Sequence, residues 1–368
     1  MKTNINEKGT CKVLVAMSGG VDSSVAAALL KEQGYQVTGV TMKIWDGTPL
    51  AKKGVHHGCY GPEEEEDIED ARKVAQTLGI PYQVIDLTSQ YKSVVLDYFC
   101  EEYLSGRTPN PCARCNQIVK FGALVERARD AGLDFDFIAS GHYARVDYDD
   151  KLKRYLLKKA KDISKDQTYF LYSLSQEQLS RLLFPLGNYT KAEIREIASR
   201  YGLQVADKPD SQNFIPGDYS AVFPAQPEPG PIMDKEGKVL GQHRGIQFYT
   251  IGQRKGLGIP SQEASYVIAT NAARNAVIVG HRNDIFKDDF IANKLNWIAT
   301  RDLCEPVVLK ARIRSSHKEV EALVTPIDDE SVLVKFKEPQ MAITPGQVVV
   351  FYNKDTVVGG GIIENLPL

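Results

Sequence analysis

Hydrophobic positions follow two patterns along the first half of the chain. Short apolar runs alternate with longer segments in which apolar residues recur every three or four positions. The short runs predict buried strands, and the longer segments predict helices. We place strands at Lys12–Met17, Gln36–Met42, Tyr82–Leu87 and Phe135–Ser140. We place helices at Asp22–Gln33, Glu63–Leu78, Tyr91–Tyr103, Gln117–Ala131 and Lys191–Arg200. This alternation predicts a parallel sheet with helices on both faces.

The pattern changes after Asp207, where proline and glycine become frequent. A cluster of these residues between 224 and 231 is typical of a domain boundary or an exposed loop. Beyond it, apolar residues lie in short strand-like segments: Tyr266–Ala269, Val277–Val279, Val307–Ile313, Val320–Val324, Val332–Phe336 and Val348–Tyr352. Short strands separated by turn residues predict a small β-rich domain and a β-barrel. We therefore expect three domains, at 1–206, 207–282 and 283–368.

Composition narrows the class of protein. Of the 368 residues, 43% are hydrophobic and 25% are charged, which is typical of a globular protein. A chain of this length needs more than one hydrophobic core. No apolar run has the length of a membrane helix, and the N-terminus lacks the apolar core of a signal peptide, so we expect a cytoplasmic protein with no membrane partner. The net charge of −2 gives no overall attraction to nucleic acid, which local basic patches would have to supply. The six cysteines lack the spacing of a disulfide framework.

A phosphate-binding loop is predicted between the first strand and the first helix. The segment Ala16–Ser24 reads Ala-Met-Ser-Gly-Gly-Val-Asp-Ser-Ser, with two glycines for close backbone approach and free N–H groups at the helix start. No lysine follows the glycines, which excludes the GxxxxGK[ST] loop. The order SGGxDS resembles the PP-loop of ATP pyrophosphatases, which cleave ATP between its α and β phosphates. Asp22 would orient magnesium or pyrophosphate there, or cap the following helix.

A second motif carries two cysteines. Gly106–Asn116 contains Cys112 and Cys115 in a C-x-x-C pair, after two prolines that stiffen the approach. We expect Cys115 just before a helix N-terminus, where the helix dipole and Arg114 would favour a thiolate. Alone, the pair could be half of a zinc site, a redox pair or chance. Beside an ATP-adenylating loop, it predicts a thiolate or persulfide that replaces an adenylated oxygen by sulfur.

The whole series of motifs closely resembles the tRNA-specific 2-thiouridylases, the MnmA family. Besides the two motifs above, the matching segments are Met42–Trp45, Ala139–Tyr143, Ser164–Leu171, Lys208–Gln212, Ile251–Gly258, Pro345–Gln347 and Gly359–Glu364. They occur in family order over nearly the whole chain. The resemblance implies a PP-loop catalytic domain, a small central domain and a C-terminal β-barrel, which together thiolate the wobble uridine of tRNA at C2.

The resemblance also implies site residues. ATP with Mg²⁺ would be bound by Ala16, Met17, Ser18, Gly19, Gly20, Val21, Asp22, Ser23, Met42 and Gly141. The extruded target base would be bordered by Asn110, Pro111 and Cys112, and tRNA would be contacted by Lys165, Asp166, Gln167, Arg314 and Ser315. Extrusion costs little because the anticodon loop is already single-stranded. For Arg314, the alternative is an ordinary arginine on the barrel surface.

Two departures from the family affect the sulfur chemistry. The usual family sequence has Asp at the position of Cys112, which leaves Cys115 as the nucleophile. The usual second catalytic cysteine precedes a Phe-Ile pair, but here Gln212 is followed directly by Asn213, Phe214 and Ile215. The relay between two cysteines therefore does not transfer intact.

Three sulfur arrangements stay open. In the first, Cys59, Cys112 and Cys115 hold a four-iron four-sulfur cluster whose open iron carries sulfide. In the second, Cys115 carries a persulfide that Cys112 resolves. In the third, the three cysteines and His56 or His57 hold a structural zinc.

Two other functions also stay open. One is a PP-loop ligase that acts on a small carboxylate, and the other is a tRNA-binding paralogue without catalysis. For thiolation, the expected partners are the tRNA anticodon arm and a sulfur donor such as a cysteine desulfurase or a relay protein.

Overall fold

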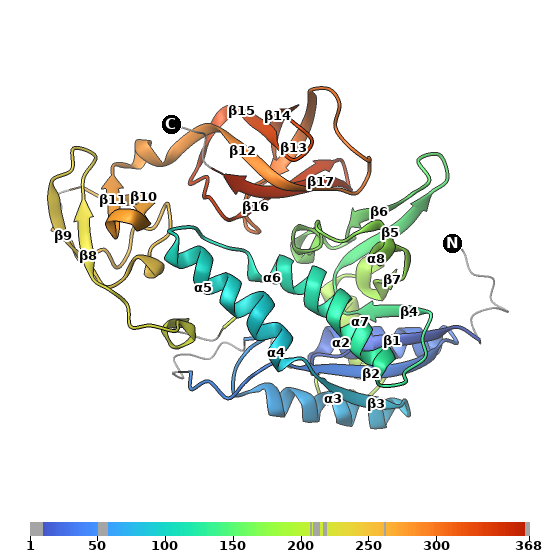
Figure 1. Ribbon diagram of the computed structural model, residues 1–368. Helices are drawn as coiled ribbons and strands as arrows, with labels where there is room; N and C mark the ends of the chain where they lie inside the picture. Colours follow the sequence, from blue (N-terminus) through green and yellow to red (C-terminus); the bar gives the residue numbers. More distant parts are fainter. Residues whose placement is uncertain are drawn as a thin grey trace. The chain divides into compact units, whose positions relative to one another are not determined.

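The structure of the protein is a computed structural model that describes residues 10–50, 58–206, 208, 214–215, 219–260 and 263–364. The chain forms two compact units (Figure 1). The first contains residues 1–95, 112–222 and 355–357, and the second contains 96–111, 223–354 and 358–368. None of the helices in the described ranges is long and apolar enough to cross a membrane.

The first unit is built on a parallel sheet of five strands in the order β3-β2-β1-β4-β7. The strands are β1 (Lys12–Ala16), β2 (Gln36–Lys43), β3 (Tyr82–Asp86), β4 (Phe137–Ser140) and β7 (Leu182–Leu183). The order runs outward from β1 in both directions. The carboxyl ends of β1 and β4 therefore form the switch point at which sheets of this kind bind ligands.

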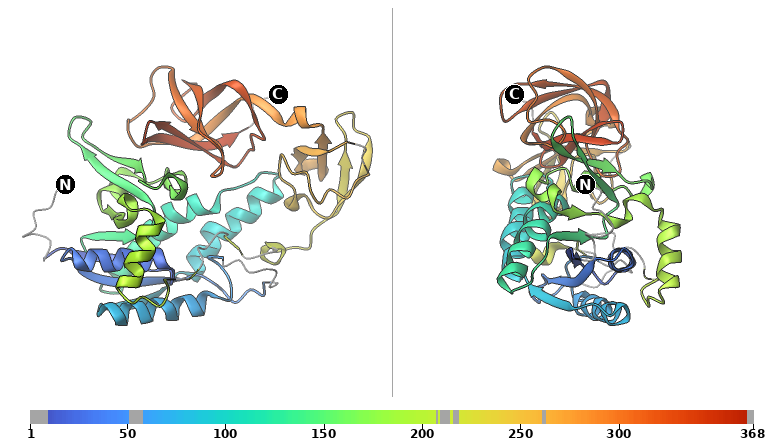
Figure 2. Two further views of the ribbon diagram at one scale, coloured as in Figure 1. Left: turned by 180° about the vertical axis from the view of Figure 1, so that it is seen from behind. Right: turned by 90° about the vertical axis from the view of Figure 1, so that its right-hand side faces the viewer.

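Helices cover both faces of this sheet. Val13 and Val15 pack on one face in a core with α2 (Val21–Glu32), α3 (Glu64–Leu78) and α9 (Lys191–Arg200). Leu14, whose side chain points to the other face, is also fully buried. Figure 2 shows these elements from two further sides. The predicted parallel sheet is confirmed, and the three helices match their predicted ranges to within one residue at each end.

Two predicted helices contain π-helical segments. The first consists of α4 (Thr88–Tyr91), a π-helix over Lys92–Leu96 and α5 (Asp97–Leu104). The second consists of α6 (Pro111–Arg114), a π-helix over Cys115–Ala123 and α7 (Leu124–Asp130). The prediction that the second helix begins at Gln117 is wrong, since it begins at Pro111. Proline is well tolerated in the first turn of a helix, where its missing N–H has no helical partner.

The first unit also contains a hairpin of β5 (Ala144–Asp149) and β6 (Arg154–Lys159) and the short helix α8 (Gln176–Ser180). The sequence pattern did not predict this hairpin.

The second unit contains a four-stranded sheet and a six-stranded barrel. The sheet has the order β10-β11-β8-β9, with β8 (Gly230–Met233), β9 (Val239–His243), β10 (Tyr266–Asn271) and β11 (Ala276–Gly280). The barrel has the order β12-β15-β14-β13-β16-β17 and closes through pairing of β12 with β17. Its strands are β12 (Phe286–Trp297), β13 (Val307–Arg312), β14 (Val320–Pro326), β15 (Val332–Met341), β16 (Val348–Asn353) and β17 (Thr356–Glu364).

The barrel is filled by alternate residues of its strands, among them Phe290, Val334 and Phe351. The predicted fold class is therefore confirmed, with a parallel-sheet domain, a small β-rich region and a closed β-barrel. The domain boundaries at 206 and 282 remain a prediction.

Candidate functional site

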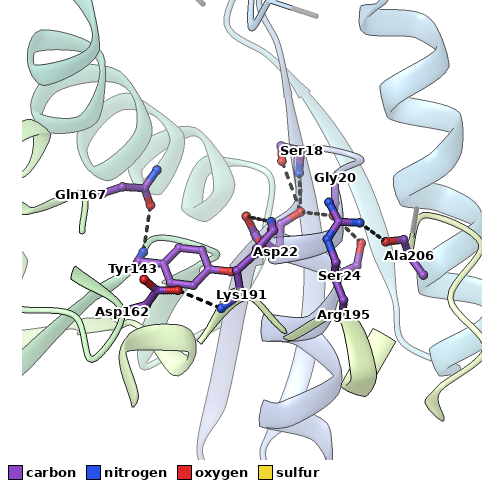
Figure 3. Close-up of polar contacts among 11 residues, drawn as sticks. Ser18, Gly20, Asp22, Ser24, Tyr143, Asp162, Gln167, Lys191, Arg195 and Ala206 are labelled. Carbon is purple, nitrogen blue, oxygen red and sulfur yellow. Dashed lines mark hydrogen bonds and ion pairs between the residues drawn. The ribbon is translucent and has the colours of Figure 1, made fainter. Parts of the chain in front are cut away.

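The loop that follows β1 is folded back on itself by serine side chains. The Ser18 N–H donates to Ser23 Oγ at 3.0 Å, and the hydroxyl groups of Ser18 and Ser23 lie 3.3 Å apart (Figure 3). The hydroxyls of Ser23 and Ser24 also donate to the Gly20 carbonyl, at 3.2 and 2.8 Å. These contacts hold the loop as a tight turn at the start of α2, whose first N–H groups form an anion-binding site.

Two glycines allow the backbone to pack closely around this loop. Gly19 has a φ of +70°, and a Cβ atom there would overlap the backbone carbonyl of Asp67. A Cβ atom on Gly141, which directly follows β4, would lie 2.6 Å from Ser23 N. The structure therefore brings the predicted residue Gly141 against the loop. Met42, another predicted ATP-site residue, lies near the carboxyl end of β2 and is half-buried.

Asp22 is held by two side chains from distant parts of the chain. Its carboxylate accepts a hydrogen bond from Tyr143 Oη at 2.8 Å and pairs with Lys191 Nζ at 2.8 and 2.9 Å (Figure 3). The residue that caps α2 is Gly20, which has no side chain to cap with. The alternative of Asp22 as a helix cap is therefore wrong. Sequence reasoning missed Lys191, because a lysine at the start of a distant helix gives no local signal.

The predicted tRNA-contacting segment around Gln167 is fixed to the residues after β4. Gln167 Oε1 accepts from the Tyr143 N–H at 2.9 Å, and the Gln167 N–H donates to the Tyr143 carbonyl at 3.0 Å. Asp166 accepts from the Ala160 N–H and from the Thr168 hydroxyl. Asp166 and Gln167 thus have structural partners within the protein. The side chain of the preceding residue, Lys165, is half-buried.

The C-x-x-C pair lies inside a helix. Because that helix begins at Pro111, Cys112 lies in its first turn and Cys115 opens the π-helix. Burial raises the pKa of Cys115 to about 11, while the nearby Lys120 charge opposes this shift. Burial and the charges of Cys59 and Cys115 raise the pKa of Cys112 to about 12. This raised pKa argues against the expected stabilised thiolate at Cys115 in the free protein.

Cys59, Cys112 and Cys115 form a group that we call the thiol cluster. The three side chains interact electrostatically with Lys120 and with the buried Tyr91. In a π-helix the hydrogen bond joins residues five apart, so Cys115 and Lys120 are separated by one π-turn. Arg114, expected to activate Cys115, instead donates through Nε to the Val94 carbonyl at 2.7 Å.

The thiol cluster is not arranged as a metal site. Within the ranges described above, no group of three or more His, Cys, Asp or Glu side chains could hold a metal ion. His56 and His57, the further ligands of the zinc alternative, lie outside the described residues. The segment 209–213, where the second family cysteine would be expected, also lies outside them.

A slow reaction of Cys115 with alkylating agents is expected in the free protein. At pH 8 a thiol with a pKa of about 11 is ionised in about one molecule in a thousand, against about one in ten for the ordinary value of 9.0. The rate with iodoacetamide should therefore keep rising up to about pH 11, and Lys120→Met should slow it further. Peptide mass spectrometry of quenched samples measures this rate. A plateau near pH 7 would show that a thiolate is stabilised.

Within the second unit, the approach to the C-x-x-C pair is tied to the barrel. The Thr108 N–H donates to the Pro345 carbonyl at 2.9 Å, and Gln347 Nε2 donates to the carbonyls of Thr108 and Pro109. Arg107 binds Glu102 and Glu364. These contacts fix the segment that leads to Asn110 and Pro111, two of the predicted base-bordering residues.

Arg314 has inner partners in the second unit. Its Nη2 donates to the carbonyls of Ile251 and Ala342 and to Thr344 Oγ1. These partners give Arg314 a structural role, and its contact with tRNA remains a prediction. Ser315, the other predicted tRNA contact of this pair, is exposed.

Comparisons with known proteins cover nearly the whole chain. Three family models match: "tRNA methyl transferase HUP domain" over residues 11–216, "tRNA methyl transferase PRC-barrel domain" over 224–281 and "Aminomethyltransferase beta-barrel domain" over 287–363. The chain is 49% identical to tRNA-specific 2-thiouridylase MnmA of Endomicrobium trichonymphae, over 96% of this chain and 98% of that protein. It is 50% identical to tRNA-specific 2-thiouridylase MnmA 1 of Caldanaerobacter subterraneus subsp. tengcongensis, with the same coverage.

Proposed function

This chain belongs to the MnmA family of tRNA-specific 2-thiouridylases, and we propose that it uses ATP to thiolate C2 of the wobble uridine in tRNA. The observation that carries the proposal is the lysine-free Ser-Gly-Gly loop at the switch point of the parallel sheet. The identity of the relatives favours thiolation over a ligase that acts on a small carboxylate. The cytoplasmic location remains a prediction.

The first chemical step activates the uridine. Its C2 oxygen attacks the α phosphorus of ATP, the bond to the β-phosphate oxygen breaks, and pyrophosphate leaves with the electron pair. In this proposal, the N–H groups at the start of α2 and the hydroxyl groups of Ser18 and Ser23, which lie together in the loop, bind phosphate oxygens. Magnesium, when bound with ATP, neutralises phosphate charge, and the Asp22 carboxylate is a suitable ligand since Mg²⁺ prefers oxygen donors.

The second step replaces the adenylated oxygen by sulfur. Of the sulfur arrangements left open, we propose the one in which Cys115 and Cys112 act as thiols. The terminal sulfur of a persulfide on Cys115 attacks C2, and the C2–O bond breaks to release AMP. Cys112 then attacks Cys115 Sγ, which breaks the sulfur–sulfur bond and leaves 2-thiouridine and a Cys112–Cys115 disulfide. A cellular thiol reductant restores the pair, and a cysteine desulfurase or relay protein reloads Cys115.

The cluster alternative predicts different contents of the purified protein. If a four-iron four-sulfur cluster carries the sulfur, anaerobically purified protein contains iron and sulfide in fixed proportion. In the persulfide mechanism, iron-free protein thiolates tRNA at the full rate. Iron, sulfide and zinc assays on the same anaerobic sample distinguish the two mechanisms and the zinc alternative.

The proposed function predicts a change in tRNA and a set of ATP products. Deletion of the gene in a host without a paralogue should remove 2-thiouridine derivatives from digested tRNA, as measured by nucleoside mass spectrometry. The purified protein, given anticodon-arm RNA and a sulfur source, should release AMP and pyrophosphate. Unchanged 2-thiouridine would contradict the assignment and favour a non-catalytic paralogue. Release of ADP and phosphate would contradict the proposed use of the loop.

A further inference from the structure

We propose that Lys191 is the cation that binds the pyrophosphate leaving group. In GxxxxGK[ST] enzymes a lysine inside the loop itself contacts the β and γ phosphates, and this loop has no such lysine. This inference rests on the proposed cleavage of ATP and adds a residue to that reaction. Lys191 lies far from the loop in sequence, at the start of α9, yet its ammonium group meets the loop at Asp22 (Figure 3).

The ammonium group is already positioned at the phosphate-binding loop. Lys191 Nζ lies 2.8 and 2.9 Å from the two Asp22 carboxylate oxygens and 5.9 Å from the centre of the Tyr143 ring. Asp22 is the second residue of α2, so this ion pair lies at the helix end that offers free N–H groups. The Lys191 and Asp22 side chains are 13% and 28% exposed, which leaves the pair accessible to a ligand.

The backbone of Lys191 is fixed, so that its side chain alone has to move. The Lys191 N–H donates to Asp162 Oδ2 at 3.1 Å. Thr190, just before Lys191, and Glu193, two residues after it, form a capping box that fixes the start of α9. Ile194 of α9 belongs to the same buried core as residues of α2, which holds the two helices together. A change of side-chain rotamer would carry the ammonium from the carboxylate to a phosphate beside it.

Charge explains why the lysine is needed. The Asp22 carboxylate lies beside the anion-binding end of α2 and would repel the phosphates of ATP. The Lys191 ammonium neutralises this carboxylate before the nucleotide binds. As pyrophosphate separates from the α phosphorus, negative charge grows on the β phosphate, and an ammonium there stabilises the transition state. Lys191 donates hydrogen bonds and transfers no proton, so the balance of the first step is unchanged.

A purely structural ion pair would explain the position less well. Asp22 already accepts a hydrogen bond from Tyr143 Oη, which orients the carboxylate without the lysine. The loop itself contains no basic residue between Ala16 and Ser24, so any cation for the leaving group has to come from elsewhere.

The test compares Lys191→Met with Lys161→Met in the full-length protein. Lys161 Nζ lies 3.0 Å from Glu193 Oε1, and Glu193 belongs to α9, the helix that begins with Lys191. This ion pair is exposed, so Lys161 is a matched control. With ATP and anticodon-arm RNA, Lys191→Met should release pyrophosphate about 100-fold more slowly than the wild type. Lys191→Arg should retain a rate within about 10-fold, because it keeps the charge. Lys161→Met should behave as the wild type, and RNA binding should be equal in all four proteins.

The double variant Asp22→Asn, Lys191→Met separates this role from a structural one. Its rate is compared with that of Asp22→Asn alone, because Asp22 is also the proposed magnesium ligand. If the lysine served only to balance Asp22, adding Lys191→Met to Asp22→Asn would cause no further loss of pyrophosphate release, and the proposal would be overturned. We expect a further loss of about 100-fold. Thermal unfolding midpoints equal to the wild type show that the variants fold, and Lys191→Gln, which also removes the charge, supplies the test if Lys191→Met does not fold. A wild type that releases no pyrophosphate would refute the proposed function, whereas equal release by wild type and Lys191→Met would refute the lysine proposal alone.

Discussion

Replacing Cys115 with serine is expected to abolish thiolation while the protein still releases pyrophosphate from ATP. A serine oxygen cannot carry the persulfide sulfur, so 2-thiouridine formation should fall by at least about a thousandfold. ATP cleavage depends on the loop after β1 and precedes sulfur transfer, so about one pyrophosphate per protein should still appear in the presence of RNA. Nucleoside mass spectrometry and a pyrophosphate assay on the same reaction measure the two steps separately.

Variants of the other cysteines show how the sulfur is delivered. In the persulfide mechanism, Cys112→Ser blocks resolution of the persulfide, whereas Cys59→Ala stays active. In the cluster mechanism, Cys59→Ala, Cys112→Ser and Cys115→Ser each lose both iron and thiolation. Cys304 is an exposed free cysteine of the barrel unit, and Cys304→Ala serves as the control. Normal thiolation by Cys115→Ser would contradict both mechanisms.

The sequence pattern predicted the helices and strands that are apolar along most of their length. α2 is apolar along most of its length, and β1 is a short apolar run, so both give clear signals. β12 was missed because it combines charged residues such as Lys287 and Asp288 with apolar ones and contains two irregular positions. A strand that bends to close a barrel departs from strict alternation, so a period-two pattern does not reveal it.

The sequence proposes candidate site residues where they are contiguous, and it misses contacts that only folding brings together. The loop Ser18–Ser24 and the C-x-x-C pair are local motifs, and the sequence located both. Lys191 meets Asp22 only because α9 packs beside α2. Similarly, the contacts of Arg314 with Ile251 and Ala342 depend on the barrel fold. No periodicity or residue spacing in the sequence predicts these contacts between distant residues.

The predicted thiolate at Cys115 depended on two opposing effects on the pKa of the thiol: a helix N-terminus lowers it, and burial raises it. A helix N-terminus lowers the pKa of a thiol by a modest amount, and the effect fades beyond the first turn. Because the helix begins at Pro111, Cys115 lies past that turn, and burial raises its pKa to about 11. A bound substrate or sulfur donor therefore has to supply the activation that the free protein lacks. A persulfide meets this need in part, since it is a better nucleophile than a thiol.

Gly141→Ala is expected to weaken ATP binding strongly, because the added methyl group has no room beside the loop. Its Cβ would lie 2.6 Å from Ser23 N and 2.7 Å from the Asp22 carbonyl carbon, both backbone atoms. Relief requires the start of α2 to move away from the end of β4, which displaces the N–H groups that would bind phosphate. Such overpacking costs about 1–3 kcal/mol, and ATP affinity should fall by about 100-fold or more. Titration calorimetry with ATP on the full-length protein measures the loss.

The control for this prediction is Gly34→Ala, just beyond the other end of α2. Gly34 has a φ of +88°, but an added Cβ would meet no atom within 4 Å. This substitution strains the backbone by about 1 kcal/mol and leaves the phosphate-binding end of α2 in place. It should therefore lower the unfolding midpoint slightly and bind ATP as the wild type does. Normal ATP binding by Gly141→Ala would contradict the close packing of the end of β4 on the loop. The backbone arrangement that holds Asp22 in contact with Tyr143 and Lys191 would then be contradicted as well.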